Sequence, residues 1–242
     1  MTTRHSNRGV VKLMDKHYIS SFGYGTTASG DYSTANGYKT TASGDYSTAN
    51  GYKTKASASG STAMGYYTEA SGVSGSTAMG LGSAASGRSS TAMGYYTEAN
   101  GVSSTAMGYS TTASDYASVT IGQYNFQGAV VTASATGFNK DNAAFVIGNG
   151  SGSGTRSDAF KVMFNGDATV SRNLTVYNDL TVDGDVVVQG KLTINGQDLT
   201  GAHVTQLLNL LTQLARLTDI NCISNTTDAL KAAYQQHSDT CP

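Results

Sequence analysis

Residues 61–66 read Ser-Thr-Ala-Met-Gly-Tyr, and the same six letters return at residues 90–95 and 104–109. Looser copies extend the series in both directions. The glycine of each copy lies fourteen residues from the next, apart from one step of fifteen, in which Gly75 is the expected insertion. The glycines of the series are Gly23, Gly37, Gly51, Gly65, Gly80, Gly94, Gly108 and Gly122. A fixed period of this kind is typical of a stacked array, because one short unit cannot bury its apolar face without neighbours.

The composition agrees with an array better than with an ordinary globular domain. The 242 residues include 29 glycines, one proline and no tryptophan, and charged residues make up 13%. Text rich in serine, threonine, alanine and glycine is usually disordered, but a disordered segment has no reason to keep a strict register. A formal net charge of −1 excludes an electrostatic hold on nucleic acid or on an anionic membrane. No stretch approaches the roughly 20 apolar residues of a membrane span, so no membrane insertion is expected.

The length of the unit predicts its secondary structure. Fourteen residues are too few for a helical hairpin, whereas two short strands and two turns fit. The Ser-Thr-Ala-Met run of each copy is expected to form one strand, and the glycine after it to supply a turn by positive φ or close backbone approach. Because neighbours in a strand face opposite sides, Ala63 and Met64 cannot share a face. We expect the alanine to fill the interior of its coil and the methionine to point outward.

The outward positions form an apolar ladder along the array. Its residues are Met64, Met79, Met93, Met107 and Ile121. Exposed to water, such a ladder is an association surface, and an interior of small alanines is too little core to stabilise a lone chain. Both difficulties disappear when several chains pack their ladders around an axis. The sequence therefore predicts an oligomer that uses this ladder as its interface.

The motif Ser-x-Ala-Met/Ile-Gly, repeated over about residues 20–125, resembles the head of trimeric autotransporter adhesins of the YadA type. The resemblance implies a left-handed parallel β-roll in each chain and three rolls packed as a homotrimer. A final copy of the turn appears at Ala144–Gly148. Asn36 and Asn50 replace the apolar residue in the first coils, so that end of the axis should be wetter. The N-terminus lacks the apolar run of an export signal, and the C-terminal text is unlike the family's membrane anchor. We therefore expect the fold of that family in a different kind of protein, made and assembled in a cytoplasm.

Downstream of the array the text changes character. Residues 145–170 resemble a passage of phage and giant-virus fibre proteins that joins a repeat stalk to a distal tip. A period of six residues follows, in which Leu/Val/Thr runs alternate with Asn-Asp and Asp-Gly turns. The runs begin at Leu174, Leu180, Val186 and Leu192. We expect them to wind around a shared three-chain axis as a trimeric β-shaft, with the apolar residues inward.

A third period begins near residue 201, where apolar residues follow the 3-4-3 spacing of a coiled-coil seam. The seam residues are Val204, Leu207, Leu211 and Leu214. Two heptads are marginal alone, so this helical bundle would depend on the trimer beside it. Cys222 and Cys241 bracket a short second helix at the end of the chain. They could pair within a chain, pair between chains, or stay free.

Tyrosines that follow the array glycines form a second ladder, with a step of about 4.8 Å per coil. Its candidate glycan-binding members are Tyr66, Tyr67, Tyr95, Tyr96 and Tyr109. Two interpretations stay open: cross-coil stacking that covers the roll, and an aromatic platform for saccharide rings of a cell surface. The four histidines are far apart and lack metal-ligand spacing, and no nucleophile elbow, phosphate loop or carboxylate pair appears. We expect no enzyme activity, no cofactor and no metal.

Together these patterns predict a mainly β, intertwined homotrimer in four parts. They are an N-terminal attachment segment (1–22), the β-roll (23–148), a β-shaft (149–200) and a helical trimerisation tip (201–242). The favoured function is a virion fibre or spike, displayed on the particle surface. Its N-terminus would dock into a capsid protein, and the trimer would bind a host glycan or receptor. Two alternatives are a capsid-decorating cement protein without receptor binding and a cell-surface trimeric adhesin.

Overall fold

The computed structural model describes residues 10–14, 17–126, 133–189, 192–194, 197–199, 202, 205–206 and 209–210. The chain divides into two units, Met1–Thr175 and Val176–Pro242, and each is described by itself.

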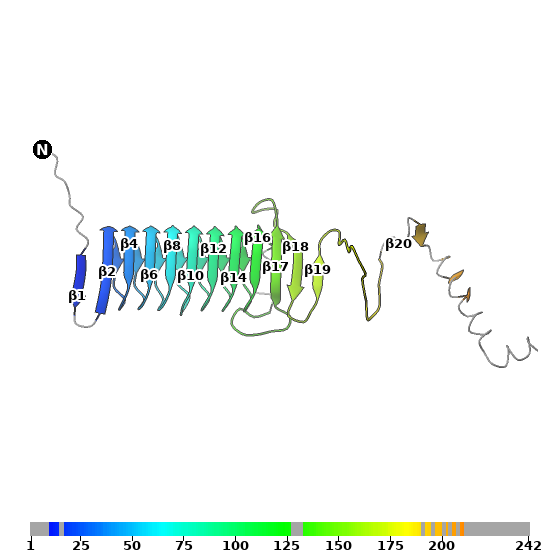
Figure 1. The fold of residues 1–242 in the computed structure, drawn as a ribbon, viewed down its shortest axis with the longest axis horizontal. Helices are drawn as coiled ribbons and strands as arrows, with labels where there is room; N and C mark the ends of the chain where they lie inside the picture. The colour runs from blue at the N-terminus through cyan, green and yellow to red at the C-terminus, as the bar shows by residue number, and fades with distance from the viewer. Residues whose placement is uncertain are drawn as a thin grey trace, which may run out of the picture. The chain divides into compact units, whose positions relative to one another are not determined.

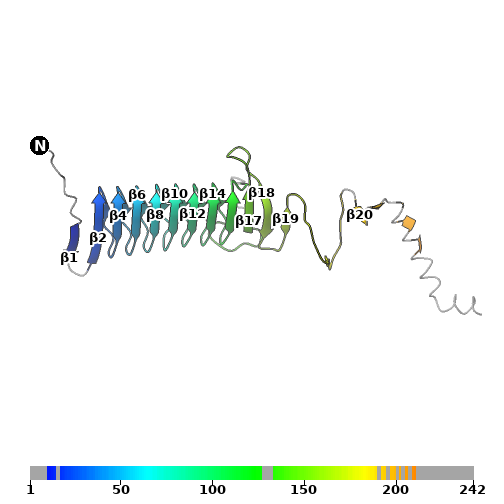
Figure 2. The same ribbon diagram turned by 45° about the horizontal axis from the view of Figure 1, so that its top comes forward.

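The first unit is a solenoid whose coils each contribute one long and one short strand (Figure 1). The long strands join into one parallel sheet, the long-strand sheet. Its repeated members are β2 (His17–Tyr24), β4 (Thr34–Tyr38), β6 (Thr48–Tyr52), β8 (Thr62–Tyr66), β10 (Thr77–Leu81), β12 (Thr91–Tyr95), β14 (Thr105–Tyr109), β16 (Val119–Gln123) and β17 (Ala143–Asn149). The two-residue strands form the second, short-strand sheet. They are β3 (Thr27–Ala28), β5 (Thr41–Ala42), β7 (Lys55–Ala56), β9 (Glu69–Ala70), β11 (Ala84–Ala85), β13 (Glu98–Ala99) and β15 (Thr112–Ala113). The strands lie side by side in coil order, as both views show (Figure 2).

The interior between the two sheets contains four columns of small side chains. At the long strands, one column is the serine directly before each strand and the other an alanine within it: Ser33, Ser47, Ser61, Ser76, Ser90 and Ser104, and Ala35, Ala49, Ala63, Ala78, Ala92 and Ala106. At the short strands, one column is the threonine or serine directly before each strand and the other the alanine within it: Thr40, Thr54, Thr68, Ser83, Thr97 and Thr111, and Ala42, Ala56, Ala70, Ala85, Ala99 and Ala113. All are at most 1% exposed. The prediction that alanine fills the coil is confirmed, and threonine and serine share the interior with it.

The array glycines lie inside the long strands, and the turn begins two residues later. β8 includes Gly65, whose φ is +127°. A Cβ on Gly65 would lie 2.0 Å from the carbonyl oxygen of Gly80 in the next coil. The predicted place of the turn is therefore wrong. The positive φ and the close backbone approach expected of these glycines are both present.

Each coil turns at corners where ordinary L-residues adopt left-handed backbone angles. Lys53 and Tyr67 have φ of +52° and +56° after their long strands, and Tyr46 has +58° before its long strand. The backbone N–H of each such corner residue donates a hydrogen bond to a carbonyl oxygen of the preceding coil, as from Tyr67 N to Tyr52 O at 2.9 Å. This repeated hydrogen bond offsets the cost of the conformation.

The fifteen-residue step is accommodated at one of these corners. Ser74 pairs with Ser59, and Gly75 has left-handed angles like those of Gly60, with φ of +61° and +66°. Both are therefore ordinary corner residues, and the expectation that Gly75 is the insertion was wrong. The extra residue is Val73, directly before them, whose side chain is 79% exposed. It bulges outward, where it disturbs no strand.

Antiparallel strands cover both ends of the long-strand sheet. β1 (Val10–Met14) pairs with β2 at the start, and β18 (Asp158–Met163) and β19 (Ala168–Val170) follow β17 at the other end. An open edge of backbone groups invites pairing with another chain, and these strands occupy it. The boundaries expected at residues 22 and 148 fall inside the sheet, since two strands of the expected attachment segment and two of the expected shaft belong to it.

The last coil is closed by polar side chains. Gly122 pairs with Gly148, so this coil spans 26 residues. Asn125 caps the short-strand sheet, because its Oδ1 accepts from Thr112 N at 2.8 Å and its Nδ2 donates to Thr112 O at 3.0 Å. Asp115 accepts from Ala143 N at 2.7 Å. The side chains thus replace the backbone partners that a further coil would supply.

In the second unit, one of the expected shaft runs is a strand. β20 (Leu192–Ile194) pairs antiparallel with β21 (Gln197–Leu199). The runs beginning at Leu174, Leu180 and Val186 form no strand among the described residues, and their leucines and valines are exposed. Helical residues are described at 202, 205–206 and 209–210.

Candidate functional site: the methionine row and the tyrosine column

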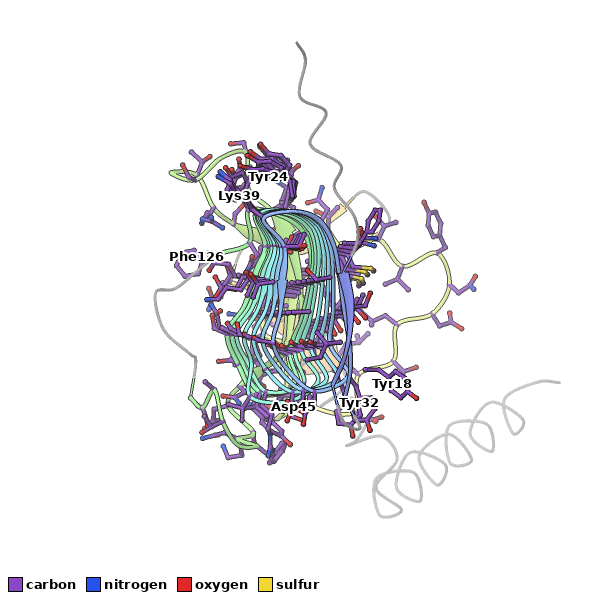
Figure 3. All side chains as sticks on the ribbon, turned by 90° about the vertical axis from the view of Figure 1, so that its left-hand side faces the viewer. Tyr18, Tyr24, Tyr32, Lys39, Asp45 and Phe126 are labelled. Carbon is purple, nitrogen blue, oxygen red and sulfur yellow. The ribbon has the colours of Figure 1, made fainter. Side chains whose placement is uncertain are left out.

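The outer face of the long-strand sheet carries the predicted ladder as a continuous row, here called the methionine row. Met64, Met79, Met93 and Met107 pair in register across β8, β10, β12 and β14. Met64 is 37% exposed and the other three are partly exposed. Viewed along the solenoid, the sulfur atoms gather on one face (Figure 3). The outward direction predicted for these residues is confirmed.

Other residues extend the row at both of its ends. Ile121 pairs with Ile147 at the C-terminal end, which brings the Ala144–Gly148 copy into register as the sequence suggested. Phe22 pairs with Asn36 at the N-terminal end, and both are exposed, as is Asn50. The continuous apolar part of the row therefore begins at Met64, after the two coils that carry Asn36 and Asn50.

The opposite face of the solenoid is polar. Lys55 and Glu69 stand next to each other on the outside of the short-strand sheet and form an ion pair at 3.0 Å. Both side chains are about half exposed, so this pair contributes little to stability. This charged face is compatible with exposure to water. The methionine row is apolar, so it is the face expected to bind a partner.

The tyrosines after the array glycines stack along one corner, called the tyrosine column. Its members are Tyr24, Tyr38, Tyr52, Tyr66, Tyr95 and Tyr109. Centroids of successive rings are 5.3, 5.0 and 4.6 Å apart from Tyr24 to Tyr66, and 4.7 Å apart between Tyr95 and Tyr109. Interplanar angles are 15° or less. The cross-coil stacking interpretation therefore describes the column correctly.

Stacking at this spacing leaves little ring surface inside the column on which a saccharide could stack. The rings inside the column cover each other's faces, so a sugar could reach only their edges. Tyr67 and Tyr96 stand beside the column, edge to face with Tyr66 and Tyr95 at 4.7 Å each. The column is interrupted at Leu81, which stands in register between Tyr66 and Tyr95. Leu81 was not among the predicted site residues, although the repeat itself shows the missing tyrosine.

A lysine bonds to the phenol of Tyr67 beside the column. Lys53 Nζ donates to Tyr67 Oη and lies 4.7 Å from the centroid of that ring. This hydrogen bond raises the pKa of Lys53 and lowers the pKa of Tyr67. At the far end of the column, the hydrogen bond with Tyr124 raises the pKa of Tyr109.

At the closing coil, burial raises the pKa of Asp158, while the hydrogen bond from Phe126 N and the charge of Lys161 lower it. Asp158 Oδ1 accepts from Phe126 N at 2.8 Å. Its place beside a closing strand gives this carboxylate a structural role. The described residues contain no group of three metal-ligating side chains. In the same part of the chain no helix is long and apolar enough to cross a membrane.

The remaining predicted interface residues and the cysteines lie outside the described residues. They are Val204, Leu207, Leu211, Leu214, Cys222 and Cys241. The coiled-coil seam and the disulfide stay predictions.

The comparison with protein families agrees with the geometry of the coils. The family model "YadA head domain repeat (2 copies)" matches residues 20–40, 42–68, 74–97 and 99–125. These coils of the solenoid are therefore similar to YadA head domain repeats. The matched residues coincide with the regular coils, from β2 to the residues just after β16. No curated protein matches the chain.

Proposed function

We propose that the chain is an adhesin-like attachment protein that acts as a homotrimer, with the methionine row of each solenoid packed around a common axis. The observation that carries the proposal is the contrast between the two surfaces of one strand. Ala63, Ala78 and Ala92 are fully buried inside the coil, while the larger Met64, Met79 and Met93 face out. The head repeats support an attachment role, since heads of this family belong to non-enzymatic adhesins on the cell surface.

The interior of the solenoid contributes little hydrophobic stabilisation for its size, because its side chains are small. Burying one methyl group contributes about 0.8 kcal/mol, whereas burying a whole valine, leucine or methionine side chain contributes about 1.5–3 kcal/mol. The repeating coils bury alanines, serines and threonines. In the coils of β8, β10, β12 and β14, a further apolar gain is open in the burial of the methionine against other copies of the chain.

The chain after the solenoid also has exposed apolar residues at a regular spacing. Leu174, Leu180 and Val186 are 68%, 68% and 69% exposed and recur every six residues. A three-chain shaft would bury them, and a helical tip would follow. The family match favours a cell-surface adhesin over the virion fibre that the downstream resemblance suggested, because nothing in the match points to a virus particle.

The proposal is tested by the mass of the protein in solution. Light scattering should give three times the 25.0 kDa mass of the chain. Met79→Asp with Met93→Asp should lower that mass or unfold the protein, because a carboxylate buried at an interface loses its hydration. A monomeric wild-type chain would contradict the proposal.

Ala84→Asp is the matched control. Ala84 faces out from the short-strand sheet, in the same row as Glu69 and Glu98, so an added carboxylate there stays in water. The trimer mass should be unchanged. Loss of the trimer in this control, or its persistence in the methionine variant, would show that another face forms the interface.

A further inference from the structure

The tyrosine column has one gap. Leu81 pairs with Tyr66 on one side and with Tyr95 on the other. Gly82 follows it, where the coils before and after have Tyr67 and Tyr96. One coil in the middle of the solenoid therefore lacks both aromatic side chains that its two neighbours have.

The gap exposes the faces of two rings. The side chain of leucine is shorter than that of tyrosine and ends at its δ carbons. In this register, the outer parts of the Tyr66 and Tyr95 rings therefore have no tyrosine ring between them. Strands are about 4.8 Å apart, so two steps separate these rings by roughly 9.6 Å, which leaves room for one ring layer. Tyr66 and Tyr95, each stacked on one face, are 45% and 39% exposed, compared with 36% for Tyr38, which is stacked on both faces.

Tyr96 forms the side wall of the gap. Its ring stands at 80° to that of Tyr95 and lies over the backbone of Gly82, where an added Cβ would come within 2.6 Å of the ring. The missing side chain at residue 82 thus allows the ring to occupy this place. Because residues 81 and 82 are leucine and glycine, this corner lacks two tyrosine rings, and the rings of Tyr66, Tyr95 and Tyr96 line the space.

We propose that this gap, the Leu81 slot, binds one pyranose ring of a gluco-configured β-linked saccharide. A ring whose substituents are all equatorial presents axial C–H groups on both faces, which suits a position between two aromatic faces. Its hydroxyls point outward around the ring, where the phenols of Tyr66, Tyr95 and Tyr96 can donate and accept.

The Leu81 slot would give the proposed attachment function a ligand, and its exposure on a cell surface rests on that function. Binding in the slot itself does not require the trimer. Tyr24, the first member of the same column, and Lys39, which follows its second member, lie at a corner away from the sulfur-bearing face (Figure 3). Packing of the methionine rows would therefore leave the slots of the trimer open. Three weak sites on one rigid body raise avidity without new contacts.

The test measures saccharide binding to the full chain. Tetra-N-acetylchitotetraose and cellotetraose are titrated against tyrosine emission, which is unmasked because the chain has 15 tyrosines and no tryptophan. Saturation-transfer NMR identifies the bound ring. A β-1,4-linked galactotetraose serves as the comparison, because its axial hydroxyl blocks one face. The two gluco-configured probes should bind, and the galactan should bind more weakly.

Leu81→Tyr is the decisive variant, because it fills the slot and completes the stack without weakening the fold. Affinity should fall by at least about tenfold, since both stacking faces are lost, while mass and thermal midpoint stay equal or rise. Tyr46→Ala removes a tyrosine from the opposite corner, where Tyr46 stacks on Tyr32. Its affinity should equal that of the wild type.

Several results would overturn the slot. These are undiminished binding by Leu81→Tyr, equal binding of the galactan, and stronger binding of N-acetyltyrosinamide than of either glucan, which would identify an aromatic side chain as the occupant. A trimeric wild type that binds none of the probes overturns the slot and leaves the proposed function standing. A monomeric chain that binds them overturns the trimer and supports the slot.

Discussion

At the scale of single residues, the interior hydroxyls are the least expected part of the solenoid. Within the described coils, the buried hydroxyl oxygens of Thr40, Thr54, Thr68 and Thr111 have no hydrogen-bond partner. Thr97 differs, because its Oγ1 donates to Ser83 Oγ at 2.9 Å. A buried hydroxyl without a partner costs free energy that an apolar group of the same shape does not.

We therefore predict opposite effects for one substitution at two equivalent positions. Thr68→Val should raise the free energy of unfolding by about 1 kcal/mol, because it removes an unpartnered hydroxyl at constant volume. Thr97→Val should lower the free energy of unfolding by about 1 kcal/mol, because it removes a hydrogen bond. The two threonines stand in the same Tyr-Tyr-Thr-Glu-Ala context. Urea unfolding at one fixed chain concentration measures both, and equal changes would contradict the assignment of partners.

At the scale of the strand, the glycine column fixes how closely the coils approach. In Gly51→Ala the new Cβ would lie 2.0 Å from Gly65 O, at a φ of +130°. The two strands would have to separate, and we expect a loss of more than about 3 kcal/mol in the free energy of unfolding. Thermal unfolding checks this.

Two further glycines provide a graded control. Gly60 has a left-handed φ of +66° and its Cβ would meet nothing closer than 3.8 Å, so Gly60→Ala should cost only about 1 kcal/mol of backbone strain. Gly154→Ala should change stability by less than about 0.5 kcal/mol, because no atom lies within 4 Å of the added Cβ. The same loss at all three positions would mean that close backbone approach does not govern the glycine column.

The strand scale also shows which features the sequence could predict. Alternation along Ser-Thr-Ala-Met predicts which side chain is buried, because it follows from the geometry of any strand. It could not show that Gly65 continues the strand, since a glycine with positive φ is equally expected in a turn. Nor could it place Val73 as the bulge, because several corner residues satisfy the same spacing. The gap at Leu81 was visible in the repeat but gained its meaning only from the ring spacing of the stack.

At the scale of the whole molecule, the question is how a solenoid with so small a core stays folded. Both ends of the long-strand sheet are covered by antiparallel strands, so stability is not gained by stacking further coils end to end. We propose lateral packing of the methionine rows as the remaining route for the described part of the chain. The period of the coils was predictable from sequence. The three-chain shaft stays a prediction.

If folding and assembly are coupled in this way, the thermal midpoint must depend on chain concentration. A trimer that dissociates as it unfolds is stabilised by mass action, so a hundredfold increase in concentration should raise the midpoint by several degrees. Calorimetric scans over that range measure the shift, and Met79→Asp should reduce it if any folded protein remains. A midpoint that does not move with concentration would mean that the solenoid is stable as a single chain, with a core of alanine, serine and threonine sufficient to hold it together.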